Sequence, residues 1–340
     1  ANTTGTQNVA VGAISLDANT TGDNNTALGY QALTANTTAG GNTALGSGAM
    51  ITSTTASGDT AVGAFAMLRT TTGSQNTAVG LSAMENTTTG YNNTSVGWES
   101  MKANTEGALN VAVGQQAMLA NTTGDKNVCV GHNTLAANTT ADNNTAIGDN
   151  ALGANTTGAN NTACGQAAFA ACTTGSDNAA LGTGAGLALT TGSNNLLLGH
   201  DAGRTGSPGG NITSGSNTIV LGDENIGNAH IQVDWTVASD QRDKTDFTAL
   251  DLGLDFVKAL APVTYKWDKR SKYGDKTADD YDLAAQTPDG THKEDWLDIG
   301  FKAQEVEALE IAAGYNKDNK TNLTTTLTED GKQYGIQYSK

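Results

Sequence analysis

The chain repeats one pattern of apolar, small and polar residues every seventeen positions. Gly recurs twelve times at this spacing, at positions 12, 29, 46, 63, 80, 97, 114, 131, 148, 165, 182 and 199. An apolar residue precedes each of these glycines, and a small residue, usually Ala, precedes that one. Asn stands four positions before each glycine, with Asp59 as the one exception. A fixed period of this length is the signature of a solenoid of stacked, equivalent units.

The second half of the repeat is as regular as the first. Leu, Met or Phe stands four positions after the glycine in ten of twelve repeats, and only Gly186 and Gly203 interrupt this column. An N-T-T-G stretch follows, and its first Thr recurs twelve times from Thr3 to Thr190. These turn-forming residues separate the apolar positions of neighbouring repeats.

Seventeen residues are too few for the helix pairs of the common helical repeats. The segment N-T-A-V-G alternates as a strand does, so each repeat is predicted to form one coil of a β-solenoid with two short strands and two turns. Stacking in register would create ladders of Asn and Thr and a thin apolar seam, over roughly 58 Å at about 4.8 Å per coil. Because the seam is narrow and the row of Ala permits close approach, we expect several chains to associate.

The repeat stops after Gly199, and the composition changes further along the chain. The next similar motif, at 217–222, arrives 23 residues later, and residues 223–238 are predicted to form a strand pair. Residues 1–238 hold 14 acidic and 4 basic side chains, whereas residues 239–340 hold 20 and 14. The sequence therefore predicts a shaft over 1–203, a β-rich neck over 204–238 and a globular domain over 239–340.

Charge and composition exclude several classes of function. The net charge of −16 disfavours binding to nucleic acid or to an anionic membrane. The chain has no apolar run near the roughly 20 residues that a membrane span needs. Cys129, Cys164 and Cys172 are odd in number and stand where other repeats have residues such as Ala, Val or Asn, so we expect packing roles. The four histidines lack metal-ligand spacing, so we expect no metal and no cofactor.

A segment with the residues of a nucleophilic site opens the charged region. In Ser239-Asp-Gln-Arg-Asp-Lys244 a serine hydroxyl and a lysine that could act as its base stand five residues apart. The same letters also fit a Ser-Asp helix cap. Downstream come a predicted helix over 247–260, ended by Pro262, and a predicted strand over 263–267. Phe247, Leu250, Leu254 and Val257 share one face of that helix. The segments G-F-K-A-Q-E-V-E (300–307) and G-I-Q-Y-S (335–339) follow.

These five segments, in this order, resemble the intramolecular chaperone domain of phage tailspikes, tail fibres and neck appendages. The resemblance implies that residues 239–340 trimerise the fibre and then cleave the bond between Ala238 and Ser239, in a single-turnover reaction without an external substrate. It assigns Ser239 as nucleophile and Lys244 as general base. Asp240 either orients Lys244 or caps the helix, and Arg242 occupies a motif position. Gln304 and Glu305 match the A-Q-E-V motif, for which we expect a structural role.

The shaft resembles the head repeats of trimeric autotransporter adhesins and the repetitive segments of phage and marine-virus fibres. Together the resemblances imply a mostly β, homotrimeric tail fibre or appendage with a small α+β chaperone domain. It would assemble in the host cytoplasm, lie in the virion tail beside other tail proteins and attach to a glycan or protein receptor on the host surface.

Three other functions fit parts of the sequence. A bacterial trimeric surface adhesin explains the shaft but leaves the last hundred residues unexplained. An ice-binding β-solenoid would use the Thr-Thr pairs as a flat ladder. A glycan-degrading enzyme would need paired carboxylates in a cleft, and the repeat offers only scattered acids. Four aromatic residues of the shaft are candidate sugar contacts: Tyr30, Phe65, Tyr91 and Trp98.

Overall fold

The protein is described from a computed structural model, which covers residues 2–226, 252–275, 281–316, 324–327 and 334–336. It divides into two compact units, Ala1–Arg204 with Ile212–Gly222, and Thr205–Asn211 with Asp223–Lys340. The first unit is a β-solenoid of seventeen-residue coils, and the second is a small unit with few helices and strands. The predicted mostly β fold class is therefore confirmed.

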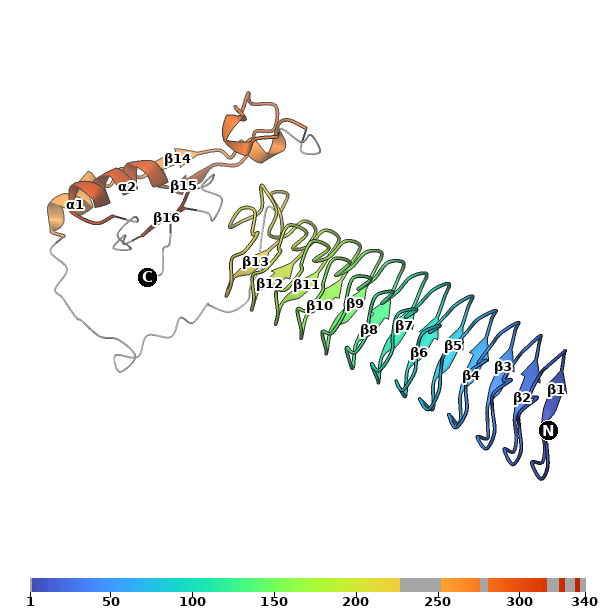
Figure 1. The fold of residues 1–340 in the computed structure, drawn as a ribbon. Coiled ribbons are helices and arrows are strands. Elements are labelled where there is room, and N and C mark those ends of the chain that lie inside the picture. The colour runs from blue at the N-terminus through green and yellow to red at the C-terminus, as the bar shows by residue number, and fades with distance from the viewer. Residues whose placement is uncertain (1, 227–251, 276–280, 317–323, 328–333, 337–340) are drawn as a thin grey trace. The chain divides into compact units, whose positions relative to one another are not determined.

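Each coil of the shaft contributes one strand of three residues, and the described strands form a single thirteen-stranded parallel sheet in chain order (Figure 1). The prediction of two strands per coil was wrong, because turns form the rest of each coil. The strands are β1 Val9–Val11, β2 Thr26–Leu28, β3 Thr43–Leu45, β4 Thr60–Val62, β5 Thr77–Val79, β6 Thr94–Val96, β7 Val111–Val113, β8 Val128–Val130, β9 Thr145–Ile147, β10 Thr162–Cys164, β11 Ala179–Leu181, β12 Leu196–Leu198 and β13 Ile219–Leu221.

The strand register follows the sequence repeat through the whole sheet. Ala27 is paired with Ala44, and each later strand pairs with the residue seventeen positions on until β12. The last step is longer, because Leu196 of β12 pairs with Ile219 of β13 across 23 residues. The sheet thus continues into a thirteenth coil that ends beyond residue 203, and the extra residues form turns between β12 and β13.

The core of the shaft consists of two columns of buried side chains. The middle residue of each strand points inward, and from β2 onward it is almost completely buried, as are the Leu, Met and Phe residues four positions after the glycine. The row of Ala lies inside the coil, so it cannot provide the close approach between chains that the sequence suggested. The largest members of the second column are Leu33, Met50, Met67, Met84, Met101, Met118, Leu135, Leu152 and Phe169.

The two interruptions of this column are compensated by neighbouring side chains. A Cβ atom on Gly186 would lie 2.3 Å from the ring of Phe169 and 2.8 Å from Cδ1 of Leu197. Leu197 occupies the middle strand position, where most earlier coils have Ala. A Cβ atom on Gly203 would lie 3.1 Å from Cδ1 of the same Leu197 side chain. Larger side chains on the strand therefore fill the space that the two glycines leave, as close packing of an interior requires.

The repeated glycine is required by stacking as well as by backbone conformation. Gly97 has a φ of +137°, and a Cβ atom there would lie 2.4 Å from the carbonyl oxygen of Gly114 in the next coil. L-residues rarely adopt this conformation, and no side-chain rotation could relieve a clash with backbone. The twelve-fold recurrence of glycine therefore follows from the geometry of the coil.

Hydrogen-bonded ladders of Asn and Thr join the coils, as the sequence predicted. The backbone N–H of Asn110 donates to Oδ1 of Asn93 at 2.9 Å, and Nδ2 of Asn110 donates to the carbonyl of Gly124 at 2.8 Å. In the Thr ladder, Oγ1 of Thr105 donates to the carbonyl of Thr122 at 3.1 Å. Because these side chains satisfy buried backbone groups in turns, they take the place of a longer strand in each coil.

Asp59 interrupts the Asn ladder with a carboxylate. Its Oδ1 accepts the backbone N–H of Asn76 at 2.7 Å, as an Asn would. Its Oδ2 is buried and has no hydrogen-bond partner among the described residues. Burial raises the pKa of Asp59 to about 7, against the opposing effect of the hydrogen bond from Asn76.

The second unit is built from short elements. In chain order these are α1 Leu254–Ala259, β14 Val263–Tyr265, 3-10 helices at Arg270–Lys272 and Leu283–Ala285, β15 Asp298–Gly300, α2 Ala303–Ala312, β16 Thr325–Leu327 and β17 Tyr334–Ile336. The strands form two antiparallel pairs, β14 with β15 and β16 with β17, and α2 contacts β16 and β17. The predicted helix and strand around Pro262 are present in the described part as α1 and β14.

Candidate functional site

The residues predicted to carry the cleavage chemistry lie outside the described part of the chain. This holds for both sides of the scissile bond, for the proposed dyad and for the motif residues between them. The strand pair predicted within 223–238 also falls largely outside it. The roles of these residues stay predictions: Ala238, Ser239, Asp240, Arg242 and Lys244. The structure does describe the scaffold that the downstream motifs form.

Two of the motifs, about forty residues apart in the sequence, are brought together by one strand pair. Thr264 of β14 pairs with Ile299 of β15, so the P-V-T-Y-K-W motif lies beside the strand that leads into G-F-K-A-Q-E-V. At the end of β14 the rings of Tyr265 and Trp267 meet edge to face, with centroids 5.2 Å apart. The ammonium of Lys269 lies 5.8 Å from the centre of the Trp267 ring. The motifs therefore define a common structural framework.

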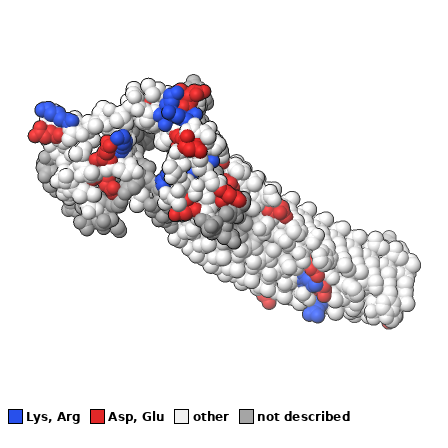
Figure 2. All heavy atoms as spheres, turned by 90° about the horizontal axis from the view of Figure 1, so that it is seen from above, with Lys and Arg blue, Asp and Glu red and all other residues white. Residues whose placement is uncertain are grey.

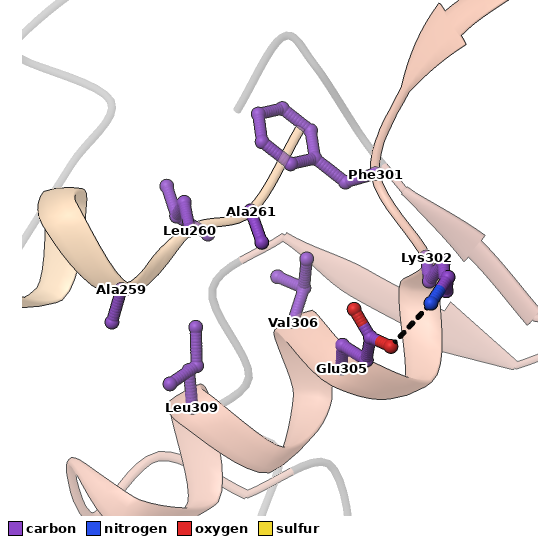
Figure 3. Close-up of a pocket in the computed structure, with 8 residues that line it drawn as sticks. All are labelled: Ala259, Leu260, Ala261, Phe301, Lys302, Glu305, Val306 and Leu309. Atoms are coloured by element: carbon purple, nitrogen blue, oxygen red, sulfur yellow. Dashed lines mark hydrogen bonds and ion pairs between the residues drawn. The ribbon is translucent and has the colours of Figure 1, made fainter. Parts of the chain in front are cut away.

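The A-Q-E-V motif forms the first turn of α2. Glu305 lies in this turn, where a negative charge complements the helix dipole. Its Oε1 is 2.7 Å from Nζ of Lys302, the residue that precedes the helix (Figure 3). Gln304 and Glu305 are exposed, whereas Val306 is buried. Glu305 thus pairs with Lys302 at the exposed start of the helix, and the structural roles expected for Gln304 and Glu305 stay predictions.

A small hollow lies between the end of α1 and one side of α2. Leu260 and Ala261 line it from one side, and Phe301, Val306 and Leu309 line it from the other (Figure 3). Its volume of about 210 Å³ includes open solvent. Ligand pockets are typically about 300–1,000 Å³, so this hollow is a packing seam and too small for a typical substrate.

The structure reveals one buried carboxylate that the sequence reasoning missed. Glu310 of α2 is 1% exposed, and its Oε1 accepts hydrogen bonds from the backbone N–H and the hydroxyl of Thr324, both at 2.7 Å. Thr325 donates to its other oxygen. Burial raises the pKa of Glu310, but the hydrogen bonds from Thr325 and Thr324 outweigh it and hold the pKa below its usual value. The sequence did hold one indication of this burial: Glu310 stands four residues after Val306, so the two lie on the same face of the helix.

Large apolar side chains remain exposed on this unit. Leu254 and Val257, on the predicted apolar face of α1, are 65% and 58% exposed, and Ile299 of β15 is 78% exposed. Exposed apolar side chains of this size are candidates for an interaction surface. The described residues contain no group of three or more His, Cys, Asp or Glu side chains placed to hold a metal ion. None of their helices is long and apolar enough to cross a membrane.

Comparison with known families identifies this unit. Residues 239–315 match the protein family described as chaperone of endosialidase, a range that includes α1, β14, β15 and α2. No curated protein and no solved structure matches the chain. The chain therefore carries a chaperone-of-endosialidase domain at the C-terminal end of a β-solenoid shaft. The family implies self-association into a trimer and a tailspike-like or fibre-like protein.

Proposed function

We propose that the chain is a phage tail-fibre or appendage protein whose C-terminal domain assembles three chains and then cuts itself off between Ala238 and Ser239. The observation that carries the proposal is the family match, which begins at Ser239 and follows a solenoid with few charged residues. Figure 2 shows the contrast, with few Lys, Arg, Asp or Glu side chains along the visible face of the shaft.

The proposed cleavage requires only groups of this chain and water. The Ser239 hydroxyl gives its proton to the neutral amine of Lys244, and Oγ attacks the carbonyl carbon of Ala238. The bond from this carbon to the Ser239 nitrogen breaks, and Lys244 returns the proton to that nitrogen. Water then hydrolyses the resulting ester. The products are a shaft ending in the Ala238 carboxylate and a released domain beginning with the Ser239 amine.

Cleavage would make assembly irreversible. The shaft is a stack of thirteen nearly identical coils. If one chain were shifted by a whole coil relative to another, every column would still meet equivalent residues, so the repeat alone does not select the correct register. A trimerising domain at one end selects the common register at the start of folding. Once it leaves, the fibre lacks the element that started its folding and is held by a kinetic barrier.

Attachment to the host surface is the function we propose for the assembled shaft. The exposed aromatic side chains support it, because aromatic rings can stack on sugars, and Tyr30, Tyr91 and Trp98 are 52%, 49% and 43% exposed. Phe65 is also exposed. The partners proposed are a glycan or protein receptor and the other proteins of the virion tail.

Intact-mass measurement of the purified chain tests the cleavage. Wild type is expected to yield fragments 1–238 and 239–340, and Ser239→Ala is expected to stay whole. Lys244→Ala should also stay whole, whereas Lys258→Ala, which removes an exposed lysine of α1, should be cut like wild type. A wild-type chain that stays whole as a trimer would remove the cleavage from the proposal and leave a retained chaperone. A cut that persists in Ser239→Ala would exclude Ser239 as nucleophile.

A further inference from the structure

The outward face of the shaft sheet is uncharged along its whole length, and one of its two columns is apolar throughout. Each strand points its first and third residues outward, and none of these 26 positions carries a charge. The first column holds Val9, Thr26, Thr43, Thr60, Thr77, Thr94, Val111, Val128, Thr145, Thr162, Ala179, Leu196 and Ile219. The third-residue column holds Val11, Leu28, Leu45, Val62, Val79, Val96, Val113, Val130, Ile147, Cys164, Leu181, Leu198 and Leu221. We call these two columns the strand face.

Within one chain the strand face has no covering layer. Leu45 is 42% exposed and Leu181 is 55% exposed, although β3 and β11 are each hydrogen-bonded to a strand on both sides. The opposite face of the same sheet packs on the buried core. The sheet of a solenoid can leave its outer face to water, but here every coil adds an apolar side chain to one continuous exposed row, and such a row marks an interaction surface.

The area of the strand face is large for a monomer and suits a long, narrow interface. Three residues span about 10 Å along a strand and adjacent strands lie about 4.8 Å apart, so thirteen strands present roughly 600 Å². The apolar third-residue column makes up about half of this area, which lies within the range of the largest apolar patches of typical monomers. The whole strand face approaches the roughly 800 Å² that each partner contributes to a standard interface. The exposed side chain of Leu81, two residues after the end of β5, would widen the contact.

The repeat restricts what can cover such a face. A partner must offer apolar side chains at the same spacing over thirteen coils, and a second copy of this chain does so by construction. We propose that the strand face is the surface through which the shafts of three chains pack, parallel and in register, around a common axis. The number three rests on the trimer in the proposed function. In this arrangement each strand lies at the height of its two copies, so equivalent residues face one another.

The chain contains a natural probe of this geometry. Cys164 belongs to the strand face and is half-buried, whereas Cys129 and Cys172 are buried in the core. Burial raises the pKa of the Cys172 thiol to about 11 and that of Cys129 further still. Because the thiolate is the reactive form, a maleimide added to the folded protein should modify Cys164. Three copies of Cys164 would then lie within reach of one short reagent.

The test is cross-linking of the folded full-length chain with a short trifunctional maleimide. Wild type should give a covalent trimer on a denaturing gel, and Cys164→Val should give none. In the Cys164→Val background, Val62→Cys should restore the trimer six coils away from the native cysteine. Thr157→Cys is the matched control in the same background, because Thr157 is exposed in the same coil but lies outside the strand. It should give no trimer.

A charge on the strand face should reduce the same signal. With Cys164 retained, Val96→Lys brings three ammonium groups together at an apolar contact, and we expect at least a tenfold loss of covalent trimer. Thr89→Lys places the same charge on an exposed turn of the same coil and should leave the yield unchanged. Circular dichroism of both variants shows whether the shaft has folded.

The outcomes separate this inference from the proposed function. If the protein sediments as a trimer but only Thr157→Cys cross-links, another face of the shaft is the interface and the inference is overturned. If none of these positions cross-links in the trimer while Cys164 still reacts with a monofunctional maleimide, the strand face is open, the contacts lie in the C-terminal domain alone and the inference is overturned. A chain that sediments as a monomer would remove both the trimer and this interface. Cleavage at Ala238, measured by mass on the same samples, is independent of all these results.

Discussion

The shaft and the C-terminal unit differ in how much of their apolar surface a single chain can bury. In the shaft each coil covers the next, so Met84 and its equivalents are completely buried without help from another chain. The C-terminal unit leaves Leu254 of α1 and Ile299 of β15 mostly exposed. A solenoid builds its core from nearest neighbours in the sequence, whereas the short elements of the second unit enclose little. The difference shows which surfaces an assembly has to complete: the second unit and the outside of the shaft.

The largest effect is expected from a methyl group at a stacking glycine. Gly97→Ala places Cβ 2.4 Å from the Gly114 carbonyl oxygen at a φ of +137°, so overpacking and backbone strain add up to about 4 kcal/mol or more. Gly253→Ala in the C-terminal unit is the matched change, because no atom lies within 4 Å of its added Cβ. It should change stability by less than about 0.5 kcal/mol. Chemical denaturation measures both, and equal effects would contradict the close stacking of the coils.

A buried carboxylate in each unit gives the second comparison. The folded-state pKa of Asp59 is raised from 3.8 to about 7, so its contribution to stability is complete below about pH 4 and is lost as the pH rises to about 7. The full loss corresponds to about 4 kcal/mol. Asp59→Asn should therefore be more stable than wild type at pH 8 and should lack this pH dependence. Thermal denaturation between pH 4 and pH 8 measures the difference.

Glu310 should respond to pH in the opposite direction. Its folded-state pKa is lowered, so it stabilises the protein above the ordinary glutamate pKa, and this contribution is lost as the pH falls through the folded-state value. Glu310→Gln should weaken the C-terminal unit at pH 7 and reduce its sensitivity to acid, by roughly 1–2 kcal/mol for the lost charged hydrogen bonds. In a Trp98→Phe background, tryptophan fluorescence reports on this unit during acid titration, because the remaining tryptophans all belong to it. A shared pH response of the two carboxylates would show that their surroundings are alike, contrary to the structure.

Truncation of an apolar side chain should also cost more stability in the shaft than in the C-terminal unit. Met84→Ala removes a completely buried side chain and should cost about 3 kcal/mol, since the stacked coils cannot collapse around the cavity. Ile311→Ala in α2 removes a side chain that is 51% exposed and should cost under about 1 kcal/mol in the isolated chain. Denaturant titration at low protein concentration measures both. A large cost at Ile311 would show that an assembled form covers this residue.

The smallest expected effect is an increase in stability. A second Asn ladder inside the shaft is interrupted at Ser53, whose hydroxyl is buried without a hydrogen-bond partner among the described residues, as is Oδ1 of Asn36 in the coil before. In the intact stretch, Nδ2 of Asn121 donates to Oδ1 of Asn104 at 2.8 Å. Ser53→Asn should restore this bond to Asn36 and raise stability by about 1 kcal/mol. Thr55→Asn, an exposed position in the same coil, should be neutral in the same melting experiment.

Much of the shaft could be predicted from the sequence because its structure is periodic. The spacing of Gly97 and its equivalents defined the coil, and the Asn and Thr columns predicted the ladders that the hydrogen bonds confirm. The number of strands per coil was not predictable in this way, because Asn and Thr side chains satisfy the backbone of the turns and only three residues per coil remain as strand. The sequence also did not show that the Leu197 side chain fills the space beside Gly186, because the contact exists only in the folded coil.

In the C-terminal unit the sequence motifs identified the family but not the arrangement of its side chains. The order of the motifs, from Ser239 to the A-Q-E-V helix, was sufficient for the resemblance that the family match supports. The burial of Glu310 was missed because its partners, Thr324 and Thr325, come from a segment that only the folded chain brings to α2. The dyad of Ser239 and Lys244 stays a prediction from the motif.

The sequence by itself determined the seventeen-residue period, the columns and the position of the chaperone domain, because each follows from local order along the chain. Only the tertiary structure decided which apolar column lies inside. The Ala column and the Val and Leu column alternate along one strand, and either could face the core by pattern alone. The coil places the small residue inside, beside the large Leu or Met of the same repeat, because the two together fill the narrow interior. The larger column is therefore left on the outside, where one chain has nothing to cover it.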